Sequence, residues 1–197
     1  MGPLTDGDDD ANTPVTEADV QGLIPSWVAT RADLNDVEAT NVARGYDWIF
    51  ANRFSIADIT DIAFVQELHR QMFGDVWEWA GVFRTTDLNI GIRWFEITEA
   101  VKQLVDNAAL RFETPGDTDA ECVDLHHQMV RIHPFINGNG RHGRAIADAA
   151  AVALGQAPFS WGSGSIVTLQ DTRTTYIAAL RRADQGDLAP LNEFARS

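Results

Sequence analysis

A glycine-rich run, HPFINGNGRHGR at residues 133–144, lies between two segments with helical spacing and restricts the fold more than any other feature. Glycine tolerates backbone conformations that other residues avoid, so Gly138 and Gly140 predict a sharp turn between two helices. The second helix is rich in alanine, and a helix N-terminus carries positive potential and unpaired N–H groups. We therefore expect two closely packed helices joined by an anion-binding turn.

Apolar residues recur at three- and four-residue spacing through most of the chain, which predicts an all-α bundle. The predicted helices cover about 31–51, 60–73, 97–112, 118–132, 141–154, 168–182 and 188–195. The segment 79–93 is instead β-prone, with turn residues at 87–91, and predicts one β-hairpin. Residues 1–15 are acidic and lack an apolar period, which predicts a disordered tail before a single domain at 16–197.

The charge of the chain excludes several classes of partner. The net charge of −14 makes direct nucleic-acid binding and attachment to anionic lipid unfavourable. No apolar run reaches the length that spans a membrane, and the acidic N-terminus is unlike a signal peptide. The single cysteine, Cys122, allows no intrachain disulfide, so we expect a soluble protein of the cytoplasm. The oligomeric state stays open.

Two arginines and a histidine give the loop its chemical character. Arg141 and Arg144 are three residues apart, so both face the first turn of the helix, beside the N–H groups of the glycine loop. Guanidinium groups at that place bind polyphosphate, and His133 at the other end of the loop could accept a proton from a hydroxyl. A plain glycine turn remains the alternative, whereas a Rossmann or P-loop site lacks its preceding strand or its Gly-Lys-Ser/Thr.

The run resembles the signature of the Fic (Fic/Doc) family, His-Pro-Phe-x-Asp/Glu-Gly-Asn-Gly-Arg-x-x-Arg. Residues 68–81 are similar to the segment before the family's flap, 83–91 to the flap itself, and 176–191 to its closing helices. The nearest subgroup in appearance is mobile mystery protein B. The resemblance covers about residues 20–196 and implies a Fic-type bundle with a β-hairpin flap.

The resemblance also implies an activity, namely transfer of AMP from ATP to a Ser, Thr or Tyr hydroxyl of a target protein. It makes His133 the general base and Phe135 the anchor of the loop in the core. The nucleotide would be bound by Gly138, Asn139, Gly140, Arg141 and Arg144. The flap would hold the target segment by strand addition. Its residues would be Thr85, Thr86, Asp87, Leu88, Asn89 and Ile90.

Asn137 departs from the family pattern, which has Asp or Glu at this position as a Mg²⁺ ligand. Mg²⁺ prefers charged oxygen donors, so we expect a weakened metal site. Three outcomes stay open: a slower transferase, a changed transferred group, or a nucleotide-binding module without chemistry, such as a toxin–antitoxin-like partner. Asn137 as a simple turn residue is a further alternative.

Glu38 lies in an apolar helical stripe with Leu34 and Val42, and a buried carboxylate needs a partner. The resemblance implies an inhibitory glutamate that pairs with the second arginine of the signature, here Arg144. A solvent-exposed glutamate is the alternative, because Leu34 and Ala39 depart from the family's inhibitory motif.

Two other charged residues, Arg84 and Arg93, flank the predicted hairpin and are expected to face solvent.

Overall fold

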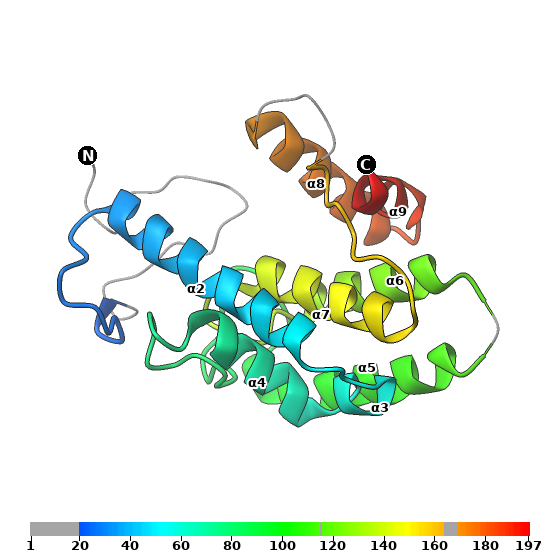
Figure 1. The fold of residues 1–197 in the computed structure, drawn as a ribbon, viewed down its shortest axis with the longest axis horizontal. Helices are drawn as coiled ribbons and strands as arrows, with labels where there is room; N and C mark the ends of the chain where they lie inside the picture. The colour runs from blue at the N-terminus through cyan, green and yellow to red at the C-terminus, as the bar shows by residue number, and fades with distance from the viewer. Residues whose placement is uncertain (1–19, 115, 164–168) are drawn as a thin grey trace.

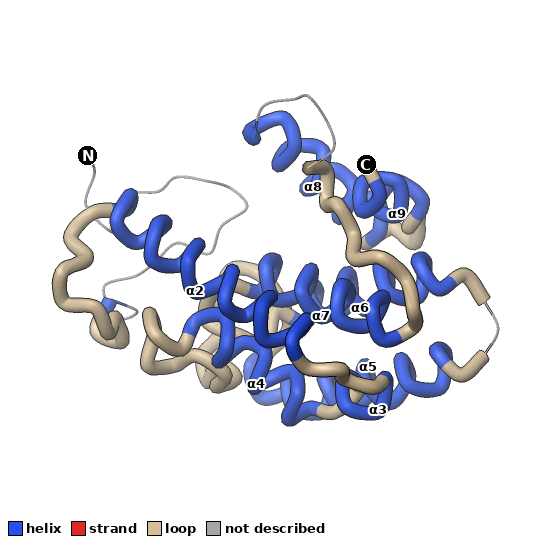
Figure 2. Tube along the Cα trace, viewed as in Figure 1, coloured by secondary structure: helices blue, strands red, loops and turns tan. Residues whose placement is uncertain are grey.

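The computed structural model describes residues 20–114, 116–163 and 169–197, and these residues are mainly helical (Figures 1 and 2). The predicted tail at 1–15 lies outside the described residues. The helices are α2 (Arg31–Ala51), α3 (Ile56–Ile59), α4 (Ile62–Phe73), α5 (Ile97–Phe112), α6 (Thr118–Ile132), α7 (Asn139–Ala153), α8 (Leu169–Ala183) and α9 (Ala189–Arg196). A 3₁₀ turn, η1 (Trp94–Glu96), precedes α5. The predicted all-α class is confirmed.

Helix α2 begins where the sequence predicts, because its first turn is closed by a reciprocal pair of hydrogen bonds. The Thr30 hydroxyl accepts from the Asp33 N–H at 3.2 Å, and the Asp33 carboxylate accepts from the Thr30 N–H at 2.9 Å. This capping box satisfies two N–H groups that the helix cannot pair internally. Gly45 then lets α2 cross α4 closely, since a Cβ there would lie 2.4 Å from Cγ of Met72. The crossing fixes the place of Glu38 relative to the rest of the molecule.

Helix α7 is the central helix of the bundle and packs against α2, α3, α4 and α6 (Figure 1). It is buried around most of its circumference, which its alanines permit by letting neighbouring helices approach closely. Gly143 marks the closest approach to α6, because a Cβ there would lie 2.9 Å from Cγ2 of Val130. The core around α7 holds both ends of the glycine loop in place.

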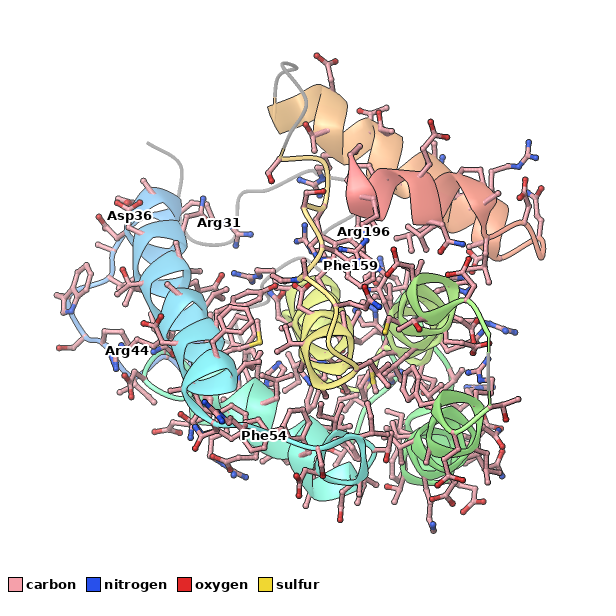
Figure 3. The ribbon with its side chains drawn as sticks, turned by 45° about the vertical axis from the view of Figure 1, so that its right-hand side comes forward. Arg31, Asp36, Arg44, Phe54, Phe159 and Arg196 are labelled. Atoms are coloured by element: carbon pink, nitrogen blue, oxygen red, sulfur yellow. The ribbon has the colours of Figure 1, made fainter. Side chains whose placement is uncertain are left out.

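The C-terminal helices α8 and α9 pack on each other, and α9 also contacts α6. Arg196 fastens this end of the chain. Its guanidinium forms an ion pair with Asp119 at the start of α6 and lies 3.9 Å from the ring centre of Phe159 (Figure 3). Phe159, in the described part of the loop that follows α7, is thereby linked to α6 and α9.

The predicted β-hairpin is wrong, because the described residues contain no strand and 82–93 form bends and irregular loop. The one β-bridge in the described part of the chain joins Leu23 to Trp77 instead. The carbonyls of Thr86 and Ile92, which a hairpin would use in its ladder, accept hydrogen bonds from the guanidinium of Arg84. A side chain therefore replaces the cross-strand pairing that the sequence pattern suggested.

None of the helices in the described ranges combines the length and the apolar character that crossing a bilayer requires. The proposal that 16–197 form one domain stays a prediction.

Candidate active site between α6 and α7

The loop from His133 to Asn139 is shaped by two residues with left-handed backbone and by one side chain. His133 ends α6 with φ +56°, and Gly138 precedes α7 with φ +78°. Asn139 closes the loop between them. Its amide accepts from the Phe135 N–H at 2.9 Å and donates to the Phe135 carbonyl at 2.8 Å. These bonds give Asn139 a structural role in the loop, whereas the nucleotide contact that the resemblance implies for it stays a prediction.

Phe135 is fully buried, as predicted, and anchors the loop through the ring of His69. The two rings stack with centres 3.7 Å apart. Nε2 of His69 donates to the Asn137 carbonyl at 3.0 Å, and Nδ1 accepts from the Gly81 N–H at 3.0 Å. Burial lowers the pKa of His69 well below its ordinary value, so the ring stays neutral. Sequence reasoning missed this role, although helical spacing placed His69 next to core residues.

His133 is almost completely buried, and its backbone and ring are both held. Nδ1 lies 3.3 Å from the Val130 carbonyl, which can only accept a hydrogen bond. The proton is therefore assigned to Nδ1, and Nε2 carries the lone pair. Burial lowers the pKa of His133 to about 4, and Arg84 adds to the effect. The imidazole is therefore neutral at neutral pH and can accept a proton at Nε2, which a general base must be able to do.

The N-terminus of α7 has the form of an anion site, because within the described residues no side chain caps it. The two signature arginines lie within its first two turns and contact different helices. Arg141 lies 4.8 Å from the ring centre of Phe73 on α4, and Arg144 lies 5.5 Å from that of Tyr176 on α8. Tyr176 also approaches Gly140, whose added Cβ would lie 3.8 Å from its hydroxyl oxygen. The two cations thus lie near the N-terminus of α7, Arg141 against α4 and Arg144 against α8.

Glu38 is buried and pairs with Arg141, so the predicted pairing with Arg144 is wrong. Oε2 of Glu38 accepts from Nη1 of Arg141 at 2.8 Å, and Oε1 accepts from Nε1 of Trp77 at 2.8 Å. Glu38 lies on the face of α2 that reaches the Phe73 side of α7, whereas Arg144 turns toward α8. The alternative of a solvated Glu38 is also excluded, since its side chain is 8% exposed.

Asn137 turns its side chain back onto the loop. Its Oδ1 accepts from the Gly138 N–H at 2.6 Å, and its backbone carbonyl is taken by His69. A neutral amide oxygen that is already engaged is a poor donor for Mg²⁺, which prefers charged oxygens. Among the described residues, no three His, Cys, Asp or Glu side chains come together as ligands. The residues present therefore do not fit a protein-held magnesium ion.

The expected flap residues lie in the loop 85–92, which we call the flap loop. Its outer side carries Asp87, which accepts from Nη1 of Arg93 at 2.8 Å and from the Trp94 N–H at 2.9 Å. Its inner side carries Gly91, which packs on His133, since an added Cβ would lie 2.6 Å from the histidine Cβ. Thr85, Thr86 and Asn89 are exposed, Leu88 is half-buried, and Ile90 is 41% exposed. The flap loop thus adjoins the histidine, although it is not a hairpin.

Arg84 was expected to face solvent and is instead buried, whereas Arg93 is exposed as expected. The burial of Arg84 could not be predicted from the sequence, because an arginine at the edge of a β-prone segment is ordinarily exposed.

The comparisons with known proteins agree with this geometry. A family model described as the Fic/DOC family matches residues 59–151. A Fido domain-containing protein of Dictyostelium discoideum is 32% identical over 110 residues, which cover 53% of this chain and 72% of that protein. The protein adenylyltransferase fic-1 of Caenorhabditis elegans is 30% identical over 136 residues, or 66% of this chain. The chain belongs to the Fic/DOC family.

The solved structures show the same fold. The Fic-1 fragment from C. elegans superposes with a TM-score of 0.66 at 24% identity, covering 91% of this chain and 52% of that one. A Fic domain from Bartonella quintana with bound ADP gives 0.66 at 16% identity, with 87% and 86% covered. The chain spans only a quarter of the length of the two Caenorhabditis adenylyltransferases that it matches. The likeness to mobile mystery protein B stays a prediction.

Proposed function

We propose that this protein transfers AMP from ATP to a Ser, Thr or Tyr hydroxyl of a target protein. The observation that carries the proposal is the loop between α6 and α7. It joins a neutral imidazole with its lone pair on Nε2 to an uncapped helix N-terminus that two arginines flank. Relatives named protein adenylyltransferases, and a neighbour with bound ADP, support the choice of nucleotide.

The proposed reaction follows from these positions. The target's hydroxyl oxygen attacks the α-phosphorus of ATP, the bond from that phosphorus to the α–β bridging oxygen breaks, and pyrophosphate leaves. Nε2 of His133 accepts the hydroxyl proton. The N–H groups of Asn139 and Gly140 hold the α- and β-phosphates, joined by that of Gly138 once it leaves Oδ1 of Asn137. Arg141 and Arg144 hold the outer phosphates. Catalysis is then mainly positioning and charge stabilisation, as phosphoryl-type transfer requires.

The flap loop is proposed to receive an extended segment of the target through backbone hydrogen bonds. Residues 87–91 are suited to this because Arg84 holds the carbonyls of Thr86 and Ile92 on either side of them. Backbone pairing selects an extended segment with an accessible hydroxyl rather than a long side-chain motif. We also propose the cytoplasm as the location, since the lone Cys122 leaves no intrachain disulfide.

Glu38 is proposed to inhibit the enzyme through Arg141. A guanidinium that is bound to a buried carboxylate is not available to a phosphate, so ATP must displace the ion pair in order to bind fully. The inhibition is therefore a competition between one carboxylate and one phosphate for the same cation.

A nucleotide-binding module without chemistry is the second candidate function, and Asn137 is the observation that favours it. Because its oxygen is neutral and engaged by Gly138, the protein brings no charged ligand for the metal that usually accompanies ATP. A Fic enzyme that transfers another phosphate-containing group is the third candidate. The groups that the loop offers suit phosphates and do not by themselves select a nucleobase.

One labelling experiment separates these candidates. The protein, alone and with a cell extract as target source, is incubated with ATP labelled at the α- or the γ-phosphate. We expect covalent label only from the α-position, the added mass of one AMP, and no label with His133→Ala. His127→Gln is the matched control, because it changes a buried imidazole of α6 whose partner is Asp184 at 2.9 Å. ATP binding by calorimetry without any product, even after Glu38→Ala, would identify the binding module. Label from the γ-position would identify a different transferred group.

A further inference from the structure

Arg84 is a buried cation whose hydrogen bonds go to backbone carbonyls. Its side chain has no exposed surface. Nε donates to the carbonyl of His133 at 2.8 Å, Nη1 to that of Thr86 at 2.7 Å, and Nη2 to that of Ile92 at 2.5 Å. A charged group is expensive to bury, so such a complete set of acceptors indicates a specific role.

These acceptors belong to two different structures. Thr86 and Ile92 lie near the two ends of the flap loop, while His133 ends α6 and carries the proposed base. The backbone N–H of Arg84 adds a bond to the Pro134 carbonyl at 2.9 Å, and the N–H of Ile92 reaches the Ile132 carbonyl at 3.3 Å. Arg84 therefore joins both ends of the flap loop to the backbone carbonyls of His133 and Pro134.

The backbone at His133 needs such support, because φ of +56° and ψ of +60° are unfavourable for a residue with a Cβ. Rotation of either neighbouring peptide would change the direction of the imidazole. Arg84 fixes the His133 carbonyl through its side chain and the Pro134 carbonyl through its own N–H. Gly91 closes the arrangement, since an added Cβ there would lie 2.9 Å from Nη2 of Arg84.

The charge environment shows that hydrogen-bond geometry, more than ion pairing, places Arg84. In the described part of the chain its one carboxylate neighbour within 4.0 Å is Asp87, at that limit. Asp87 is itself engaged by Arg93 and the Trp94 N–H on the outer side of the flap loop. Three carbonyls in divergent directions match the planar fork of a guanidinium, whereas an ammonium on a lysine stem could not span them.

We propose that Arg84 is the positioning residue of the active site, which holds His133 in its strained conformation and couples that conformation to the flap loop. This inference rests on the proposed transferase function. It has a direct consequence for catalysis, because a target segment that orders the flap loop also orders the base through the same guanidinium. Arg84 touches neither ATP nor the hydroxyl in this scheme, so its loss should reduce turnover and spare nucleotide binding.

The test compares Arg84→Lys and Arg84→Ala with Arg93→Ala, which removes the exposed arginine that pairs with Asp87 on the outer side of the flap loop. A displaced catalytic group costs roughly 100-fold in rate, and we expect about that fall in kcat for both Arg84 variants. The KM for ATP should stay within about twofold, because the cradle at α7 is unchanged. Arg93→Ala should leave kcat near the wild-type value. Wild-type kcat in Arg84→Lys, or a loss confined to KM, overturns the proposal.

Two further measurements separate positioning from folding. N-ethylguanidine, which replaces the atoms removed in Arg84→Ala, should restore kcat at least tenfold, while ethylammonium at equal concentration should not; equal rescue by both would overturn the geometric argument. Independently of activity, the imidazole NMR signals of His133 and the hydrogen exchange of residues 85–92 should change in Arg84→Lys, with α7 still protected. Unchanged signals overturn the proposal even if the wild type makes no product, in which case the proposed function fails separately.

Discussion

Glu38 on α2 and Arg141 on α7 are 103 positions apart in the sequence and form an ion pair of 2.8 Å at the proposed phosphate site. The other oxygen of Glu38 accepts from the indole N–H of Trp77, which is almost fully buried. The carboxylate thus has two partners with different functions. Arg141 is shared with the phosphate of ATP, whereas Trp77 belongs to the core.

This arrangement predicts opposite effects of Glu38→Ala on binding and on stability. Release of Arg141 should tighten ATP binding about tenfold, or about 1.4 kcal/mol, and raise the rate of label transfer. The buried N–H of Trp77 loses its partner, which should lower the free energy of unfolding by about 1–3 kcal/mol. Calorimetric titration and urea unfolding measure the two effects. Asp36→Ala, at an exposed position of the same helix (Figure 3), should change neither. Unchanged ATP affinity in Glu38→Ala would contradict the inhibitory role.

The partner of Glu38 shows what sequence could and could not predict. The helices follow from periodic apolar residues and from local caps such as Thr30 with Asp33, and these depend only on neighbours in the chain. The choice between Arg141 and Arg144 depends on how α2 crosses α7. The two arginines are three residues apart on α7, so the relative rotation and translation of α2 and α7 decide which of them meets Glu38.

The β-hairpin was wrongly predicted for a related reason. Strand propensity in 79–93 describes a local backbone preference. In the structure the carbonyls of Thr86 and Ile92 are instead bound by the side chain of Arg84, which no strand propensity indicates. His69 was missed as well, because its contacts with Gly81 and Asn137 join three separate segments. The turn between α6 and α7 and the burial of Phe135 were predictable, since the residues of 133–144 lie close together in the sequence.

A charged residue at position 137 should restore metal binding. In Asn137→Asp the carboxylate can keep the hydrogen bond from Gly138 and add a charged oxygen for Mg²⁺. We expect the affinity for Mn²⁺ in the presence of ATP, measured by electron paramagnetic resonance, to rise on the order of tenfold, or about 1.4 kcal/mol. Asn89→Asp on the exposed flap loop adds the same charge and should have no such effect. Equal affinities in the two variants would show that the loop does not direct this oxygen at the phosphates.

The buried histidines predict that the fold weakens as the pH falls. Burial lowers the pKa of His133 and His142 to about 4 and that of His126 to about 3, against 6.5 in the unfolded chain. Between pH 6.5 and those values the unfolded state binds more protons, so stability is lost as the pH falls through this window. Each histidine should cost on the order of 1.4 kcal/mol per pH unit there. Asp148 opposes the trend, because burial raises its pKa.

Urea midpoints measured from pH 7.5 to 4.5 test this expectation. The midpoint should fall steadily below pH 6.5, and imidazole NMR should show neutral rings in the folded protein at pH 5.5. A midpoint that stays level down to pH 5 would contradict the expectation. It would mean that water reaches these rings in the folded protein and that their pKa values are not lowered.

Gly138 and Gly155 offer a matched pair of alanine substitutions. Both have left-handed backbone, with φ of +78° and +80°, so both variants carry similar strain, roughly 1–2 kcal/mol. They differ in their surroundings. A Cβ at Gly138 would lie 2.6 Å from Cζ of Phe73, whereas nothing lies within 4 Å of one at Gly155. Phe73 is buried and cannot withdraw, so Gly138→Ala should lose about 1–3 kcal/mol more.

The same comparison has a functional side, because Phe73 also faces Arg141. A methyl group at position 138 pushes against Phe73 and displaces the ring beneath the guanidinium, so ATP affinity should fall together with stability. In Gly155→Ala, at the far end of α7, only the small strain should appear and ATP affinity should be unchanged. Urea unfolding and calorimetric titration of the two variants measure both effects. Equal losses of stability in the two would mean that Phe73 yields, and that backbone strain alone, rather than packing, requires glycine at position 138.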